Sequence, residues 1–127
     1  MTYFHARTID GDFDAVLQRT REALQKHGFG VLTEIDVQST LKAKIGADFR
    51  PYRILGACNP RMAHEALEME PHVGAMLPCN VVVQQADAGV EVFAIDPVAS
   101  MRAIDNAGLL NHAGTVGAQL RAAVDDI

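Results

Sequence analysis

Long hydrophobic runs and cysteines are both scarce in this chain of 127 residues. The most apolar segment, residues 73–83, is interrupted by Pro78 and Asn80 and is much shorter than the ~18 residues that a membrane-spanning helix needs. The first twelve residues mix charged and polar side chains and lack the apolar centre of a secretory signal. We therefore expect a cytoplasmic protein with no membrane partner.

Basic residues are scarce as well, above all in the second half of the chain. The formal net charge is -5, and residues 64–127 contain two Lys or Arg against nine Asp or Glu. Nucleic-acid binding depends largely on clustered Lys and Arg that replace the counterions of phosphates. The one basic stretch consists of Lys42, Lys44, Arg50 and Arg53, and short stretches of this kind usually lie on a solvated face. We expect no nucleic-acid partner.

Recognisable catalytic motifs are absent from the sequence. There is no Cys-x-x-Cys pair and no serine between the glycines of a nucleophile elbow. The Gly28-Phe29-Gly30 segment follows a helical pattern instead of opening one, which is contrary to a dinucleotide-binding loop. Two cysteines without an export signal indicate reduced thiols, so thiol chemistry is the only enzymatic candidate, and no cofactor is expected.

What the chain does contain is the composition of one compact domain. Apolar residues make up 49% and charged residues 21%, close to the average of folded soluble domains. A chain of this length can bury roughly two thirds of its unfolded surface, so it needs no disulfide to build a core. We expect a single domain over residues 1–127.

Capping residues and hydrophobic spacing predict the order of helices and strands. Asp36, Asn59 and Asp96 each precede a helical pattern as N-caps, and the last two are followed by proline in the first turn. Asp12 and Asp14 suit the positive end of the dipole of the first predicted helix. Glycine follows two of the helical patterns as a left-handed stop. The predicted strands are residues 2–8, 29–35, 50–57, 80–85 and 90–95, and the predicted helices are residues 13–27, 37–45, 60–70, 97–104 and 109–124. This order predicts an α+β domain with a single mixed sheet and helices packed on one face.

Two segments resemble the signature of a known family. Residues 54–60 (ILGACNP) and 77–83 (LPCNVVV) are similar to the signature of the domain of unknown function 302 family, and residues 28–31, 44–49, 63–67 and 94–97 match it in order and spacing. The resemblance implies a mainly antiparallel sheet in a TATA-binding-protein-like arrangement. It also implies a homodimer of bacterial or archaeal origin. It implies no particular reaction or substrate.

The two cysteine turns within these segments are the candidate site. Cys58 precedes the N-cap Asn59, so its sulfur could face the positive end of the following helix, a position that favours the thiolate. Cys79 likewise precedes an asparagine, Asn80. If the two turns meet, they form a dithiol site or a small polar pocket beside the strand that begins near Tyr52.

Three functional interpretations of these turns remain open. The preferred one is a homodimeric binding or accessory module with a pocket for an unknown small molecule. The second is a thiol-dependent redox or sulfur-handling protein in which Cys58 attacks and Cys79 resolves. The third makes the turns purely structural, because free cysteine is often a buried small hydrophobe, and assigns the acidic second half a protein-interaction role.

A metal site is not predicted. His64, Glu68 and His72 are the nearest potential ligands to the cysteines, and their spacing matches no familiar zinc pattern. The first two lie four residues apart, the spacing of an exposed pair on one helix face. Of the remaining histidines, His112 is expected at a surface or cap position, as are the others.

Overall fold

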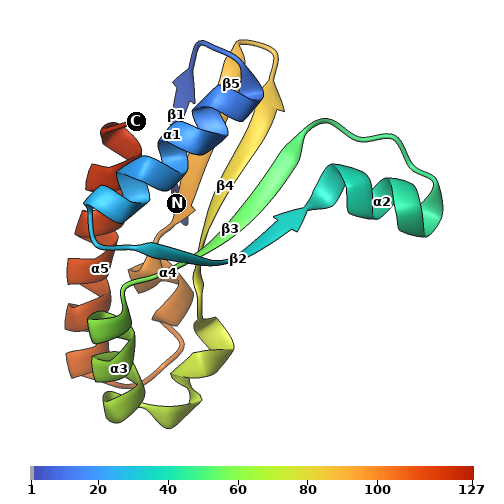
Figure 1. Ribbon diagram of the computed structural model, residues 1–127. Helices are drawn as coiled ribbons and strands as arrows, with labels where there is room; N and C mark the ends of the chain where they lie inside the picture. The colour runs from blue at the N-terminus through green and yellow to red at the C-terminus, as the bar shows by residue number, and fades with distance from the viewer. Residues whose placement is uncertain (1) are drawn as a thin grey trace.

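The computed structural model describes residues 2–127 and contains one five-stranded sheet (Figure 1). The strand order is β1-β5-β4-β3-β2, so β1 and β2 form the two edges. All four strand pairs are antiparallel. The strands are β1 (Phe4–Ile9), β2 (Gly30–Asp36), β3 (Tyr52–Cys58), β4 (Cys79–Ala86) and β5 (Gly89–Ile95).

Helix α1 (Phe13–Lys26) covers the sheet with the stripe that its sequence predicts. Asp12 caps it by accepting a hydrogen bond from the backbone N–H of Ala15, at 3.1 Å. Val16, Leu17 and Leu24 face inward and are buried against the sheet. Apolar residues at this spacing gather on one helical face, so the buried stripe follows directly from the sequence.

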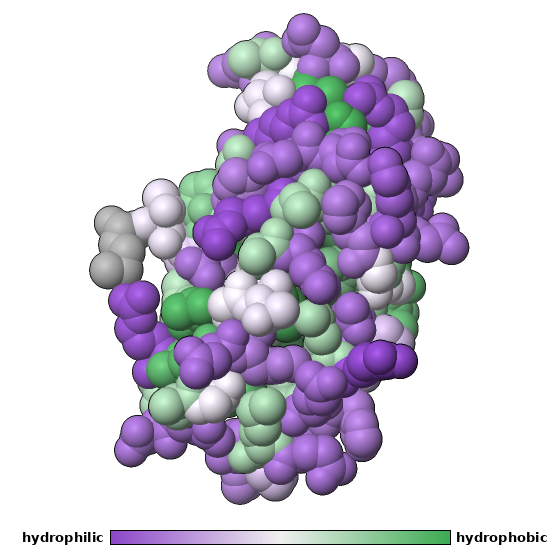
Figure 2. All heavy atoms as spheres, turned by 90° about the vertical axis from the view of Figure 1, so that its left-hand side faces the viewer, coloured by the Kyte–Doolittle hydropathy of each residue, from purple (hydrophilic) through white to green (hydrophobic). Residues whose placement is uncertain are grey.

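Helix α5 (Ala107–Asp125) lies beside α1 and completes the first hydrophobic core (Figure 1). Leu120 and Val124 join the buried side chains of α1 and the inward-facing residues of β3, β4 and β5. The outer surface on the α5 side is mostly hydrophilic, with smaller apolar patches between the polar side chains (Figure 2). The sequence predicted that this helix begins at residue 109, whereas it begins two residues earlier at Ala107, with Asn106 as its N-cap.

A second, smaller hydrophobic core lies at the end of the sheet where β3 finishes and β4 begins. It is built by α3 (Pro60–Met69), the 3₁₀ helix η1 (Pro71–Met76), α4 (Pro97–Met101) and the first half of α5. Its buried residues are Ala66, Val73, Met101, Leu109 and Ala113. The sequence did not predict η1, and α4 is shorter than the expected 97–104.

Helix α2 (Val37–Ile45) projects away from the rest of the molecule (Figure 1). Its caps match the prediction, with Asp36 accepting from the N–H of Ser39 and Gly46 in the left-handed conformation at φ 68°. None of its residues is buried, and Ile45 is 72% exposed. The helix therefore forms from its local sequence without a core to pack against.

The predicted fold class is confirmed as α+β. The sheet is wholly antiparallel over residues 2–127, which fulfils the mainly antiparallel expectation and leaves no parallel pair to make it mixed. Within the same residues, no helix has the length and apolar character required to cross a lipid bilayer.

Candidate ligand-binding site

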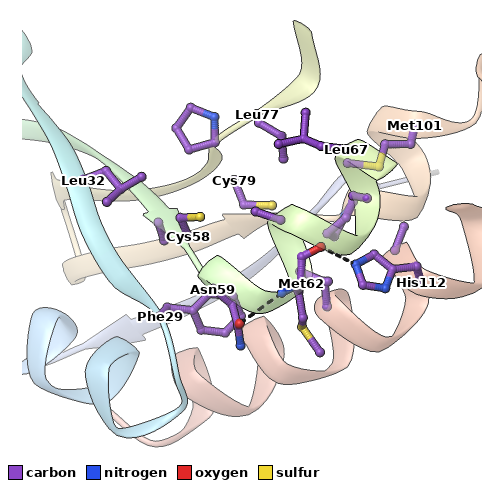
Figure 3. Close-up of a pocket in the computed structure, with 17 residues that line it drawn as sticks. Phe29, Leu32, Cys58, Asn59, Met62, Leu67, Leu77, Cys79, Met101 and His112 are labelled. Carbon is purple, nitrogen blue, oxygen red and sulfur yellow. Dashed lines mark hydrogen bonds between the residues drawn. The ribbon is translucent and has the colours of Figure 1, made fainter. Parts of the chain in front are cut away.

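The two cysteine turns lie side by side at one end of the sheet. Cys58 is the last residue of β3 and Cys79 is the first residue of β4, and Ala57 is paired directly with Cys79. Because neighbouring antiparallel strands run in opposite directions, the end of one meets the start of the next. Both sulfur atoms point toward the same space between the sheet and α3 (Figure 3).

That space is a cavity of about 300 Å³ at the junction of the two hydrophobic cores. From the first core it is lined by Phe29, and from the second by Met101. Small side chains make up much of its wall where larger ones could have filled it. The complete lining consists of Phe29, Leu32, Ala57, Cys58, Asn59, Met62, Ala63, Ala66, Leu67, Leu77, Pro78, Cys79, Pro97, Met101, His112, Ala113 and Val116.

Burial raises the pKa of both thiols. Burial raises the pKa of Cys58 above its ordinary value, and no lowering effect offsets it. Burial raises the pKa of Cys79 to about 11, with a smaller contribution from the neighbouring Cys58. Burial therefore acts against the thiolate that the positive end of α3 was expected to favour at Cys58.

Asn59 lines the cavity, but its side chain has a structural task. Its Oδ1 accepts a hydrogen bond from the backbone N–H of Met62 at 3.3 Å and so caps α3 (Figure 3). Its Nδ2 lies 3.2 Å from the position that a Cβ on Gly28 would occupy. Gly28 has φ 88°, so the close approach of Asn59 and the left-handed backbone both require glycine there.

Asn80 and Tyr52 lie outside the cavity, contrary to the prediction that they belong with the cysteines. Asn80 is exposed beside Ser100 and Ile95, because successive residues of a strand point to opposite faces and Cys79 points inward. Tyr52 begins β3, about 20 Å from Cys58 at the rise of an extended strand. Its ring contacts Phe49, with 5.9 Å between the ring centres.

His112 is part of the cavity wall and not a surface residue as predicted. Its side chain is 11% exposed, and its Nε2 lies 2.7 Å from the carbonyl oxygen of Met62 (Figure 3). Its Nδ1 lies 3.6 Å from a carboxylate oxygen of Glu65. Both ring nitrogens therefore face partners within the protein, which ties α5 to α3.

A β-bulge directs Leu32 to the cavity. The register of β2 against β3 shifts between Val31, which is opposite Ala57, and Thr33, which is opposite Gly56. Leu32 is the extra residue, and such bulges redirect a side chain that regular pairing would point elsewhere. It lines the cavity and is still 66% exposed, so it forms part of the rim.

The comparisons with known proteins agree with this architecture. Residues 5–127 match the model of the domain of unknown function DUF302. The chain belongs to this family. The crystal structure of an uncharacterised conserved DUF302 protein from Bacillus stearothermophilus is 28% identical and superposes with a TM-score of 0.93, over 99% of this chain and 98% of that one. No curated protein matches the chain.

Most of the cavity wall of this DUF302 protein was not identified from the sequence. Sequence reasoning found Cys58, Cys79 and Asn59 because unusual turns mark them, whereas Met62, Leu67 and His112 lie in ordinary helical patterns. Only the number of small residues on the inner face of α3 could have been a signal. Among residues 2–127, no three His, Cys, Asp or Glu side chains are grouped closely enough to hold a metal ion.

Proposed function

We propose that this DUF302 protein is a binding module whose cavity at the cysteine turns takes a small molecule. The observation that carries the proposal is an apolar, solvent-connected cavity of about 300 Å³ between two otherwise closely packed cores. Protein interiors are packed about as densely as organic crystals, and this space differs from the other hollows of the molecule in its mainly apolar lining. It is also within the range of volumes typical of ligand sites.

The alanines of the wall support this proposal. Ala57, Ala63, Ala66 and Ala113 all line the cavity, contributed by β3, α3 and α5. A leucine or methionine at one of the helical positions would fill much of the space and add apolar contact. Four small residues converging on one space are what a site for another molecule needs.

Binding of a neutral apolar dye tests the proposal. We expect N-phenyl-1-naphthylamine to bind with a fluorescence increase at one molecule per chain. The Ala63→Leu variant should lose at least tenfold in affinity, because the larger side chain occupies the cavity. Ala43→Leu, the same change on the exposed helix α2, is the matched control and should bind like the wild type. Equal dye binding by the wild type and Ala63→Leu would refute the cavity as the site.

The thiol-dependent alternative receives less support from the surroundings of the two thiols, although their sulfurs face the same cavity. Attack by sulfur requires the thiolate, and burial disfavours it at both Cys58 and Cys79. We expect iodoacetamide labelling of Cys58 to stay slow at neutral pH and to rise only above pH ~8.5, the ordinary cysteine pKa. Labelling of Cys79 should follow an apparent pKa of about 11. A labelling midpoint for Cys58 below pH 7 would restore the thiol-dependent alternative.

The same proposal includes a homodimer, with the β2 edge and the α2 arm as the contact surface. Ile35 and Ile45 are 49% and 72% exposed, and β2 has an unpaired edge. An unpaired strand edge with exposed apolar side chains is a template for pairing with a second copy. In sedimentation equilibrium we expect a dimer for the wild type and a monomer for Ile35→Glu. Thr115→Glu on the exposed face of α5, away from this surface, is the control for added charge and should stay dimeric.

A further inference from the structure

Few polar side chains line the cavity. Its lining contains no Asp, Glu, Lys or Arg, and its polar side chains are Asn59, His112 and the two thiols. A charged group that leaves water for such a space loses its hydration, and no opposite charge replaces it. The wall therefore disfavours the entry of a charged ligand.

Two polar atoms of the wall already have partners within the protein. The Oδ1 of Asn59 accepts from the N–H of Met62, and the Nε2 of His112 lies 2.7 Å from the carbonyl oxygen of the same residue. The second ring nitrogen of His112 faces Glu65 outside the lining. A ligand that needed these groups as donors or acceptors would compete with the contacts that hold α3 in place.

The two thiols keep the cavity neutral. Cys58 and Cys79 both have a raised pKa, so both carry their proton at neutral pH. A protonated thiol is only a weak hydrogen-bond donor and behaves as a small apolar group. The sulfurs therefore add soft, polarizable surface to the wall without adding charge.

The rim of the cavity is apolar as well. Leu32 of β2 and Leu67 of α3 both line the cavity, yet they are 66% and 42% exposed. Exposed leucines beside an open cavity gain most when an apolar molecule covers them, because burial of apolar surface contributes about 25 cal/mol per Å². The rim and the wall thus favour the same kind of ligand.

We infer that the cavity selects an uncharged, mainly hydrocarbon ligand about the size of one or two fused rings, and that it excludes the corresponding anions and cations. This inference rests on the proposed binding function. The size follows from the volume: an apolar cavity of about 150 Å³ admits benzene, and this one has about twice that space. Binding is driven by the removal of apolar surface from water and involves no ion pair with the wall.

A matched set of three naphthalene derivatives tests the selection. Naphthalene, 2-naphthoate and 2-naphthylmethylammonium share one ring system and differ in charge. Each is used at pH 7.5 to displace N-phenyl-1-naphthylamine from the wild-type protein, and Ala43→Leu is measured in parallel as a folded control. We expect naphthalene to displace the dye at least tenfold more effectively than either ion.

The outcomes separate this inference from the proposed function. If either ion displaces the dye within twofold of naphthalene, the selection against charge is wrong while the cavity remains a binding site. If neither the dye nor naphthalene itself binds, the proposed function fails. Leu67→Lys adds a further check, since a cation at the rim should raise the affinity for 2-naphthoate relative to that for naphthalene at least threefold. An unchanged ratio of the two affinities in that variant would overturn the assignment of Leu67 to the ligand rim.

Discussion

The two hydrophobic cores of this protein differ in how fully their side chains occupy the space between the elements. Under α1 and α5, branched residues from the sheet and the helices meet, and Leu24, Leu55 and Leu120 are at most 1% exposed. Where α3 and the first half of α5 approach the cysteine turns, alanines face one another and a cavity remains. One sheet thus carries a closely packed region and a region in which small side chains leave a cavity.

The largest expected effect comes from removing a side chain in the filled core. Leu120→Ala should lower the free energy of unfolding by about 2–5 kcal/mol, because the surrounding helices and sheet cannot close the new space. Leu67→Ala at the cavity rim should cost only about 1 kcal/mol, since that side chain is already half in water. Urea denaturation of the two variants measures the contrast. Similar losses at both positions would mean that the two cores are packed alike.

A substitution at Gly56 tests whether the strands at the cavity end of the sheet are loosely packed. A Cβ at this position would clash with the hydroxyl of Thr33 and would lie 2.7 Å from Cγ of Pro78. Gly56→Ala should therefore destabilise the protein by about 1–3 kcal/mol, the usual range for overpacking. Thermal unfolding followed by circular dichroism measures it. A neutral substitution would indicate that the strands beside Cys58 move apart easily.

Filling the cavity should change stability much less than emptying the core. Ala63→Leu places apolar atoms into existing space, so we expect a change within about 1 kcal/mol of the wild type, in either direction. Ala43→Leu on the exposed α2 helix should be nearly neutral. A loss of more than about 3 kcal/mol in Ala63→Leu would mean that the space is not available to an extra side chain.

The smallest effect concerns the charged outer edge of the filled core. The Arg21 guanidinium, assisted by Arg53, holds the pKa of Glu34 below its ordinary value. This contribution is fully present above the ordinary glutamate pKa of about 4.3 and is lost as the pH falls through the lowered native value. Glu34→Gln should cost about 0.2–1 kcal/mol at pH 7 and less at pH 2. The free energy of unfolding as a function of pH measures this difference, and a parallel loss at both pH values would exclude an electrostatic origin.

Local structure was largely predictable from the sequence. The predicted caps Asp36, Asn59 and Asp96 all accept hydrogen bonds from the first turn of the helix that follows them. These signals act over three or four residues, so they do not depend on the rest of the fold. The 3₁₀ helix η1 was missed because a segment with both Pro71 and Gly74 resembles an irregular loop.

Long-range arrangement was not predictable in the same way. The Val37, Leu41 and Ile45 stripe correctly predicts a helix, but only the structure reveals that this helix has no core to pack against. Likewise, Tyr52 was grouped with the cysteines because it shares their strand, although an extended strand separates residues quickly in space. Its position on the same strand as Cys58 therefore did not place Tyr52 in the cavity wall.

By itself, the sequence determined which segments are helices and strands and marked the two cysteine turns as unusual, because caps, glycines and hydrophobic spacing act locally. Only the tertiary structure decided that these turns meet at neighbouring strand ends and that α3 and α5 leave a cavity over them. The tertiary structure also raises the pKa of both thiols, because the atoms that bury them come from segments far apart along the chain.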